Sequence, residues 1–250
     1  MKFMDKPKAL LTYLSGTLGQ IFIISLAVFL LRNIGMTVDY TTALGMVFIV
    51  IGGISSALWG AIVKIKYQKA KIKEILIDFV NVRQPISSYV LVLAFLLLDF
   101  CYILYGGKLQ IGSWYIPVIL FLKAILFGGI EEIGWRYTFQ PILEEKLNYI
   151  FSTVLTFVSW GVWHLLYFYI EGSLNQADIM PFLLGLLINC FILSALYNKT
   201  RSLWICAMTH ALINTLSQIS SDGNFYISLI CKAVIVVMAV VVSHKAKSKT

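Results

Sequence analysis

Long apolar runs separated by short polar stretches are the feature that most constrains the fold of this chain. A helix needs about 20 mostly apolar residues to cross about 30 Å of hydrocarbon. The hydrophobic content of 59% and the mean hydropathy of +0.85 exceed what soluble domains show, where apolar residues make up roughly 45 to 50%. The sequence therefore predicts an all-α polytopic membrane protein with about eight transmembrane helices, at residues 9–31, 41–63, 88–106, 115–135, 151–170, 180–197, 203–220 and 226–243.

The polar connections give no sign of a second domain. They are short, and the sequence contains no repeat, no linker rich in proline, glycine or serine, and no low-complexity tract. We therefore expect residues 1–250 to form a single transmembrane domain, one bundle whose polar motifs fall within residues 120–220. The first apolar run is longer than a signal-peptide core of about 7 to 15 residues, so it is interpreted as an uncleaved first span.

The basic residues predict the orientation of the bundle, because cytoplasmic loops of membrane proteins carry an excess of lysine and arginine. On alternate sides the sequence has sixteen basic residues against two, Arg32 and Lys108. Both termini are therefore predicted to be cytoplasmic, in a multi-pass protein of the cell membrane. The net charge of +8 is then mostly a topology signal, so we expect the lipid bilayer and no nucleic acid as a partner. No sequence feature indicates an oligomeric state. The sixteen residues are Lys2, Lys6, Lys8, Lys64, Lys66, Lys69, Lys71, Lys73, Arg83, Arg136, Lys146, Lys199, Arg201, Lys245, Lys247 and Lys249.

The segment from Lys64 to Arg83 interleaves lysines with apolar residues. Two interpretations stay open for it: an interfacial helix on anionic lipid or an ordinary positive loop.

The four cysteines lie in apolar runs without CxxC spacing, which favours buried structural thiols over disulfides or metal ligands. They are Cys101, Cys190, Cys206 and Cys231.

Six polar side chains lie inside or at the edge of these apolar segments: Glu131, Glu132, Arg136, His164, His210 and Asn214. An ionisable side chain at the bilayer centre costs on the order of 3 kcal/mol, so such groups face a protein interior and mark a functional site. On a regular helix Glu132 and Arg136 share one face, while Glu131 is turned by about 100°. We expect Glu132 to pair with Arg136 and Glu131 to face a cavity as a general base. The alternative is that Arg136 is a boundary charge with the two glutamates as its counterions.

The histidines strengthen the prediction of a site. His164 follows Trp160 by four residues and His210 precedes Asn214 by four, so each pair shares one helical face. A single membrane histidine is usually a hydrogen-bonded packing residue. Two histidines in different spans, together with the paired glutamates, favour a common functional site.

The motifs that these residues form resemble those of a known family. Glu131-Glu132-Ile-Gly-Trp-Arg136 resembles the EExxxR motif of the CAAX protease and bacteriocin-processing family, also called the Abi family. Trp160-Gly-Val-Trp-His164 is similar to its FxxxH motif, with tryptophan in place of the usual phenylalanine. His210-Ala-Leu-Ile-Asn214 is similar to its HxxxN or HxxxB motif. The order of the three motifs, in the second half of the chain, is also that of the family.

The resemblance implies an intramembrane endopeptidase that cleaves near the end of a membrane-associated peptide or protein. Glu131 would be the base and would position and deprotonate a water with His164. His210 and Asn214 would donate hydrogen bonds to the oxyanion, at roughly 3 kcal/mol per donor. Glu132, Arg136 and Trp160 would support the site, and Glu132 could share the role of base.

A catalytic zinc is the alternative mechanism, since two histidines and a glutamate with water can bind this metal. Its ligands would be Glu131, His164 and His210. Neither histidine belongs to an HExxH helix, and Asn214 suits an oxyanion donor better than a zinc ligand, so we favour an enzyme without a cofactor.

Substrate class stays open between bacterial peptide maturation, bacteriocin immunity and CAAX-type processing. Two functions of other classes are weighed beside the peptidase: a noncatalytic membrane scaffold that regulates a partner protein, and a proton-coupled transporter. The complete motif set argues against the scaffold. The missing internal repeat argues against the transporter.

Two expectations concern depth in the membrane. Asp99 and Lys123 reach similar depths from opposite ends of their spans, so we expect a structural ion pair between them. The alternative is that Lys123 faces the cavity and binds a substrate carboxylate.

The depths of Glu131 and His164 disagree if the spans are placed as above. At a rise of 1.5 Å per residue, Glu131 lies about 8 Å from the helix end marked by Arg136, whereas His164 lies about 20 Å from the start of its span. Either the stretch from Pro141 to Ser152 is partly an interfacial helix and the fifth span starts later, or the fourth helix continues past Arg136 into the cytosol. In both cases we expect the cavity to open toward the cytosol.

Overall fold

The computed structural model describes residues 5–221 and 223–247, so that Lys2 and Lys249 of the predicted basic ends lie outside the described residues. The described chain is mostly helical, and its only β-type pairing is an isolated antiparallel bridge between Leu109 and Ser220. The predicted all-α class is confirmed. The helices are α1 (Lys6–Asn33), α2 (Ala43–Gly53), α3 (Ser55–Gln68), α4 (Ile72–Phe79), α5 (Ile86–Asp99), η1 (Cys101–Leu104), α6 (Ile116–Phe127), η2 (Gly129–Glu131), α7 (Glu132–Gly134), η3 (Trp135–Phe139), α8 (Gln140–Glu144), α9 (Tyr149–Glu171), α10 (Ile179–Thr200), α11 (Leu203–Ile219) and α12 (Phe225–Lys247).

Five helical segments of the described chain are long and apolar enough to cross a bilayer. They are Lys6–Asn33, Ala43–Gln68, Tyr149–Glu171, Ile179–Thr200 and Phe225–Ala246. The other three predicted segments are also helical, but their helices are shorter or interrupted: α5 has 14 residues, α6 has 12 and α11 has 17. The chain is thus a multi-pass membrane protein with five helices of spanning length.

The contacts of the chain define two compact units. The first comprises the chain up to Ile72 together with Ile133–Leu187. The second comprises Lys73–Glu132 and the chain from Ile188 onward.

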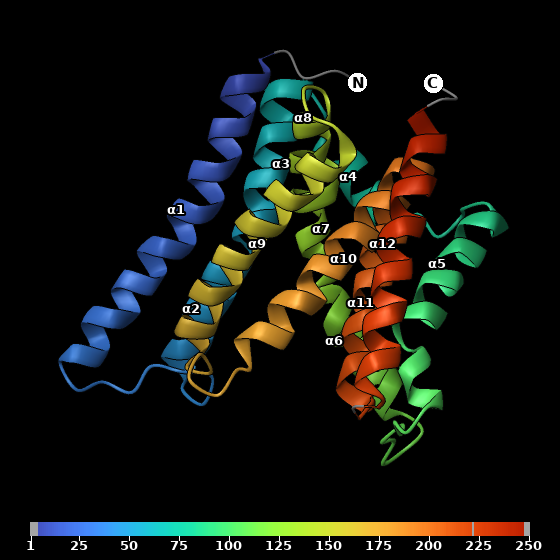
Figure 1. Ribbon diagram of the computed structural model, residues 1–250. Helices are drawn as coiled ribbons and strands as arrows, with labels where there is room; N and C mark the ends of the chain where they lie inside the picture. Colours follow the sequence, from blue (N-terminus) through green and yellow to red (C-terminus); the bar gives the residue numbers. More distant parts are fainter. Residues whose placement is uncertain (1–4, 222, 248–250) are drawn as a thin grey trace. The chain divides into compact units, whose positions relative to one another are not determined.

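In the first unit, α1 packs along α2, α3 and α9 (Figure 1). The helices approach closely where side chains are small. A methyl group on Gly16 of α1 would overlap the ring of Trp59 on α3, and the indole N–H of Trp59 donates to Gln20 Oε1 at 2.9 Å. Small residues permit this approach between helices, as they do in membrane proteins generally.

Each end of the first unit is joined by charged groups. At one end Lys6 of α1 forms an ion pair with Glu145, which follows α8. At the other end the guanidinium of Arg32 donates to the carbonyls of Tyr169 and Ile170 at 2.9 and 3.2 Å. It also donates from Nε to the Val38 carbonyl at 3.0 Å. Arg32 therefore satisfies carbonyls at the C-terminal end of α9, where helices leave acceptors without intrahelical partners.

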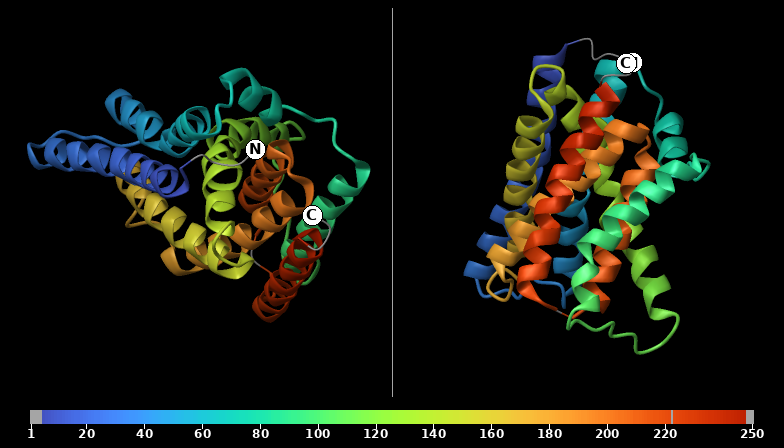
Figure 2. Two further views of the ribbon diagram at one scale, coloured as in Figure 1. Left: turned by 90° about the horizontal axis from the view of Figure 1, so that it is seen from above. Right: turned by 45° about the vertical axis from the view of Figure 1, so that its right-hand side comes forward.

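In the second unit, α11 packs on α6 and α12 packs on α5, as Figure 2 shows for the green α5 and the red α12. One end is held by the indole N–H of Trp204, which donates to Tyr89 Oη at 3.2 Å, and by Asn198, which donates to Ser243 at 2.7 Å. The opposite end carries the bridge between Leu109 and Ser220.

Candidate active site

The chain between α6 and α8, which carries the first motif, is not a regular α-helix. It passes from the 3-10 turn η2 through the short α7 to the π turn η3. In the π turn the amide of Gln140 donates to the carbonyl of Trp135, five residues earlier. The stretch is therefore not one regular α-helix, because the turns before and after residue 135 wind differently, and the pairing of Glu132 with Arg136 stays a prediction.

The helical run does not end at Arg136. It continues through α8 to Glu144, and α9 begins at Tyr149, slightly before the predicted start at 151. The helical run thus continues past Arg136, as one of the two explanations for the unequal depths requires.

The two glutamates of the first motif are buried in the second unit, with 5% exposure for Glu131 and none for Glu132. Glu132 Oε1 lies 2.8 Å from Nδ1 of His210, a residue of α11 that is itself 4% exposed. A buried hydrogen bond between a carboxylate and an imidazole fixes both the ring orientation and its tautomer. The Nδ1 atom of His210 is thus occupied, and its Nε2 atom is the one that can act on another group.

Gly128 leaves room for the polar atoms of the third motif. A methyl group built on Gly128 would lie 2.7 Å from Asn214 Nδ2 and 3.0 Å from His210 Nε2. Both nitrogens therefore lie close to one point beside the Gly128 backbone. The backbone of Gly128 has a φ of −98°, so contact, and not conformation, is what favours glycine at this position.

Gly129 allows α11 to approach the 3-10 turn. A methyl group on Gly129 would lie 3.1 Å from the carbonyl oxygen of Ala207 and 3.4 Å from its Cβ. Ala207 is fully buried one turn before His210. Two glycines and one alanine thus bring the backbone before Glu131 against the helix that carries His210 and Asn214.

In the first unit, His164 lies among aromatic side chains. Its ring centroid is 4.9 Å from that of Trp163, 5.0 Å from Phe182, 5.4 Å from Trp160 and 5.8 Å from Phe168. Rings at such distances restrict the imidazole to few orientations. His164 is half-buried, while both tryptophans are buried.

Arg136 is fully buried in the same unit, and its guanidinium carbon lies 4.2 Å from the ring centroid of Trp160. Tryptophan is the best aromatic partner for a cation. This contact gives a physical reason for tryptophan at the position where the family usually has phenylalanine. Trp135 packs at 6.1 Å from the Trp160 ring and extends the same cluster.

The predicted site residues are thus divided between the units. Glu131, Glu132, His210 and Asn214 belong to the second unit, whereas Arg136, Trp160 and His164 belong to the first. The Glu132–His210 hydrogen bond was missed from the sequence because its partners are 78 residues apart. Gly128 was missed as well, although a Gly-Gly pair one residue before the two glutamates was a usable signal.

Asp99 and Lys123 do not form the predicted ion pair in the part of the chain that is described. Lys123 is exposed on α6, and the cation whose charge acts on Asp99 is Lys232 of α12. Depth along two spans gives the height of a side chain but not which helices are neighbours, and α12 is the helix that packs on α5.

The zinc alternative requires a cluster of side chains that can bind a metal ion. Within residues 5–221 and 223–247, no three histidine, cysteine, aspartate or glutamate side chains converge as metal ligands do. The Glu132–His210 pair alone fits either chemistry, because a zinc-bound histidine commonly donates its other ring N–H to a carboxylate. The pair therefore does not choose between a metal-free site and the zinc alternative.

The three motifs fall within the part of the chain that matches a family model. Residues 113–216 match the model described as type II CAAX prenyl endopeptidase Rce1-like. The comparison with curated proteins gives no match. The matched residues contain the glutamate, the first histidine and the second histidine motifs in full, so the resemblance inferred from them is confirmed. Residues 113–216 are thus similar to the Rce1-like CAAX prenyl endopeptidases, the protease family that the three motifs resemble.

Proposed function

We propose that the protein is an intramembrane endopeptidase that hydrolyses a peptide bond near the end of a membrane-associated peptide or protein. The observation that carries the proposal is that His210 Nε2 and Asn214 Nδ2 both lie close to one point beside Gly128. Two nitrogen donors that face one point are what stabilisation of an oxyanion requires. The buried Glu131 lies in the same unit, three residues after Gly128.

In the proposed reaction, the Glu131 carboxylate takes a proton from water, and the resulting hydroxide adds to the carbonyl carbon of the scissile bond. The carbonyl oxygen becomes an oxyanion that accepts hydrogen bonds from Asn214 and His210. Collapse of the tetrahedral intermediate breaks the C–N bond, and Glu131 returns the proton to the leaving amine. By the family resemblance, His164 helps to position the water.

The Glu132–His210 hydrogen bond sets a condition on this role of His210. One proton lies between Nδ1 and Oε1, since these atoms are 2.8 Å apart. Donation to the oxyanion requires a second proton on Nε2. The pair must therefore hold two protons together when Nε2 donates to the oxyanion.

We further propose eight transmembrane helices with both termini in the cytosol of a cell membrane and a site that opens toward the cytosol. Contacts inside each unit support this alternation. Lys6 meets Glu145 at one end of the first unit, and Arg32 meets the end of α9 at the other. In the second unit the connection before α11 meets the start of α5 through Trp204 and Tyr89.

Peptide processing by the full-length protein in liposomes tests the proposal. The probes are a fluorescence-quenched peptide with a farnesylated CAAX-type end and the same peptide carrying an apolar anchor without the prenyl group. Asn214→Ala and His210→Ala are each expected to lower kcat about 100-fold or more, as loss of one oxyanion donor does. Glu131→Gln is expected to abolish cleavage. His244→Ala and Glu74→Gln, which change exposed residues of the same types, are the matched controls and are expected to keep full activity.

The same assay separates the alternatives. Cleavage that is insensitive to a strong zinc chelator and requires Glu131 supports the metal-free mechanism. Cleavage that the chelator abolishes and added zinc restores makes Glu131, His164 and His210 metal ligands. If the wild-type protein cuts neither probe and the Glu131→Gln variant keeps the cellular phenotype, the peptidase proposal is wrong and the scaffold interpretation replaces it.

A further inference from the structure

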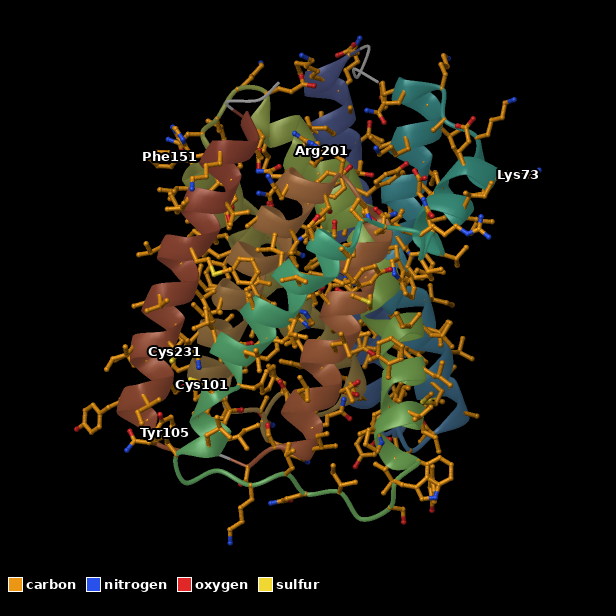
Figure 3. The ribbon with its side chains drawn as sticks, turned by 90° about the vertical axis from the view of Figure 1, so that its right-hand side faces the viewer. Lys73, Cys101, Tyr105, Phe151, Arg201 and Cys231 are labelled. Carbon is orange, nitrogen blue, oxygen red and sulfur yellow. The ribbon has the colours of Figure 1, made fainter. Side chains whose placement is uncertain are left out.

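Two cysteines that are far apart in the sequence meet in the second unit, outside the candidate active site. Cys101 is the first residue of η1 and Cys231 lies in the second turn of α12. Their sulfur atoms are 2.7 Å apart, although the residues are separated by 130 positions (Figure 3). Both side chains are half-buried, in contrast to the buried Cys190 and Cys206. These two residues are therefore less buried than the sequence predicted.

The surrounding backbone holds the two thiols in place. The chain after η1 and the connection between α11 and α12 are joined by backbone hydrogen bonds and by the bridge between Leu109 and Ser220. The Tyr102 hydroxyl, one residue after Cys101, also lies 3.2 Å from Ser220 Oγ. The backbone bonds are Gln110 N–H to the Ile219 carbonyl at 2.6 Å, Ser221 to Lys108 at 2.8 Å and Asn224 to Tyr105 at 3.0 Å.

We propose that Cys101 and Cys231 form a disulfide bond that ties η1 to α12. An S–S bond is about 2.0 Å long, so the sulfurs, now 2.7 Å apart, need to approach by about 0.7 Å within a frame that is already fixed. The bond forms when the two thiols lose two protons and two electrons to a disulfide oxidant, a small molecule or a thiol–disulfide exchange protein. The oxidant's own disulfide is reduced to two thiols.

The position of the pair in the second unit suits oxidation. Figure 3 places Cys101, Cys231 and Tyr105 toward one end of this unit and Arg201 at the opposite end. The end with Arg201 is the basic one, which we propose to be cytosolic. The thiols then lie toward the outer face, where disulfides form and persist, whereas cytosolic thiols are kept reduced. The disulfide does not depend on peptidase activity.

Peptide mapping of the full-length protein in native membranes tests the proposal. Free thiols are alkylated with N-ethylmaleimide in denaturing detergent, without reductant, and the protein is cut with trypsin. Trypsin leaves Cys101 in peptide 84–108 and Cys231 in peptide 202–232, which also contains Cys206. We expect a linked species of these two peptides that carries maleimide on Cys206 and separates after dithiothreitol.

The control variants make the assignment specific. In Cys231→Ser, Cys101 is expected to become fully alkylated, while Cys190→Ser leaves the linked species unchanged. Reduction is expected to lower the thermal midpoint of the wild type by about 5 °C and to leave that of Cys101→Ser unchanged. The proposal is overturned if Cys101 and Cys231 are both alkylated even after incubation with oxidised glutathione, or if Cys231 is linked to Cys206 instead.

Discussion

Replacement of Gly128 by alanine tests the geometry of the proposed oxyanion site most directly. The added methyl group would lie 2.7 Å from Asn214 Nδ2 and 3.0 Å from His210 Nε2, where ordinary contact begins at 3.4 Å. The amide nitrogen must therefore retreat by about 0.7 Å and the ring nitrogen by about 0.4 Å. The φ of −98° at this position suits alanine, so strain in the backbone contributes nothing to the effect.

The displacement is large compared with the tolerance of a catalytic hydrogen bond. A donor moved by 0.7 Å from about 2.9 Å no longer makes a useful bond, and loss of one oxyanion donor costs about 3 kcal/mol, or about 100-fold in kcat. The retreat of the His210 ring also disturbs its 2.8 Å hydrogen bond with Glu132. We expect kcat to fall at least 100-fold while KM changes little, because the donors act on the transition state.

Two other glycines provide matched controls for this measurement. A methyl group on Gly19 of α1 or Gly185 of α10 meets no atom within 4 Å, so both alanine variants are expected to keep wild-type kcat. The substitution Gly128→Ala is also made in an Asn214→Ala background, which removes the nearer nitrogen. There its further effect on kcat should shrink to a few-fold, since the two changes act on one contact.

The reasoning about Gly128 is refuted by either of two results in the quenched-peptide assay with folded variants. One is a kcat of Gly128→Ala within threefold of the Gly19→Ala and Gly185→Ala variants. The other is full additivity of the two substitutions, which would mean that the methyl group acts elsewhere. Far-ultraviolet circular dichroism and the thermal midpoint of each variant establish that the fold is kept.

Other contacts give further predictions. Glu132→Gln keeps the shape of the side chain but removes the carboxylate that orients the His210 ring, so kcat should fall more than tenfold; an unchanged kcat would contradict the proposed role of this hydrogen bond. Trp160→Phe weakens the cation–π contact and leaves a small cavity, so the free energy of unfolding in detergent should fall by about 2 kcal/mol, with activity largely kept. Arg32→Ala removes the donors at the end of α9 and should cost about 3 kcal/mol in the same measurement, whereas no change would show that water replaces them. Hydrogen bonds from the Thr41 hydroxyl and amide hold the pKa of Asp39 below its usual value. The stabilisation by the ionised Asp39 carboxylate is therefore present above about pH 4 and is lost as pH falls through the lower folded-state pKa. Asp39→Asn should flatten that part of the curve of thermal midpoint against pH.

The sequence was sufficient for the helices and for the polar motifs because both are local patterns. Apolar runs of spanning length follow from hydropathy, and Glu131, Glu132, His210 and Asn214 were identified by their cost in an apolar segment. The hydrogen bond between Glu132 and His210 was not predictable in this way. It depends on the packing of α11 on η2, which brings together residues 78 positions apart.

Two other expectations failed for the same reason. The predicted pair of Asp99 and Lys123 used depth alone, and the neighbour of α5 is α12. The approach of Cys101 and Cys231 depends on the same neighbour. Which helices lie side by side is a property of the tertiary fold that periodicity along one chain does not contain.

The π turn at Trp135–Phe139 has a consequence for protein design. A π turn contains one residue more than the α-helical turn it replaces, and each residue of an α-helix advances by about 100°. A redesign that idealised the stretch from Gly129 to Glu144 as one straight helix would keep every letter of the EExxxR motif. It would nevertheless rotate Glu131 and Glu132 by about a quarter of a turn relative to α8, so the motif would survive in the sequence while its geometry was lost.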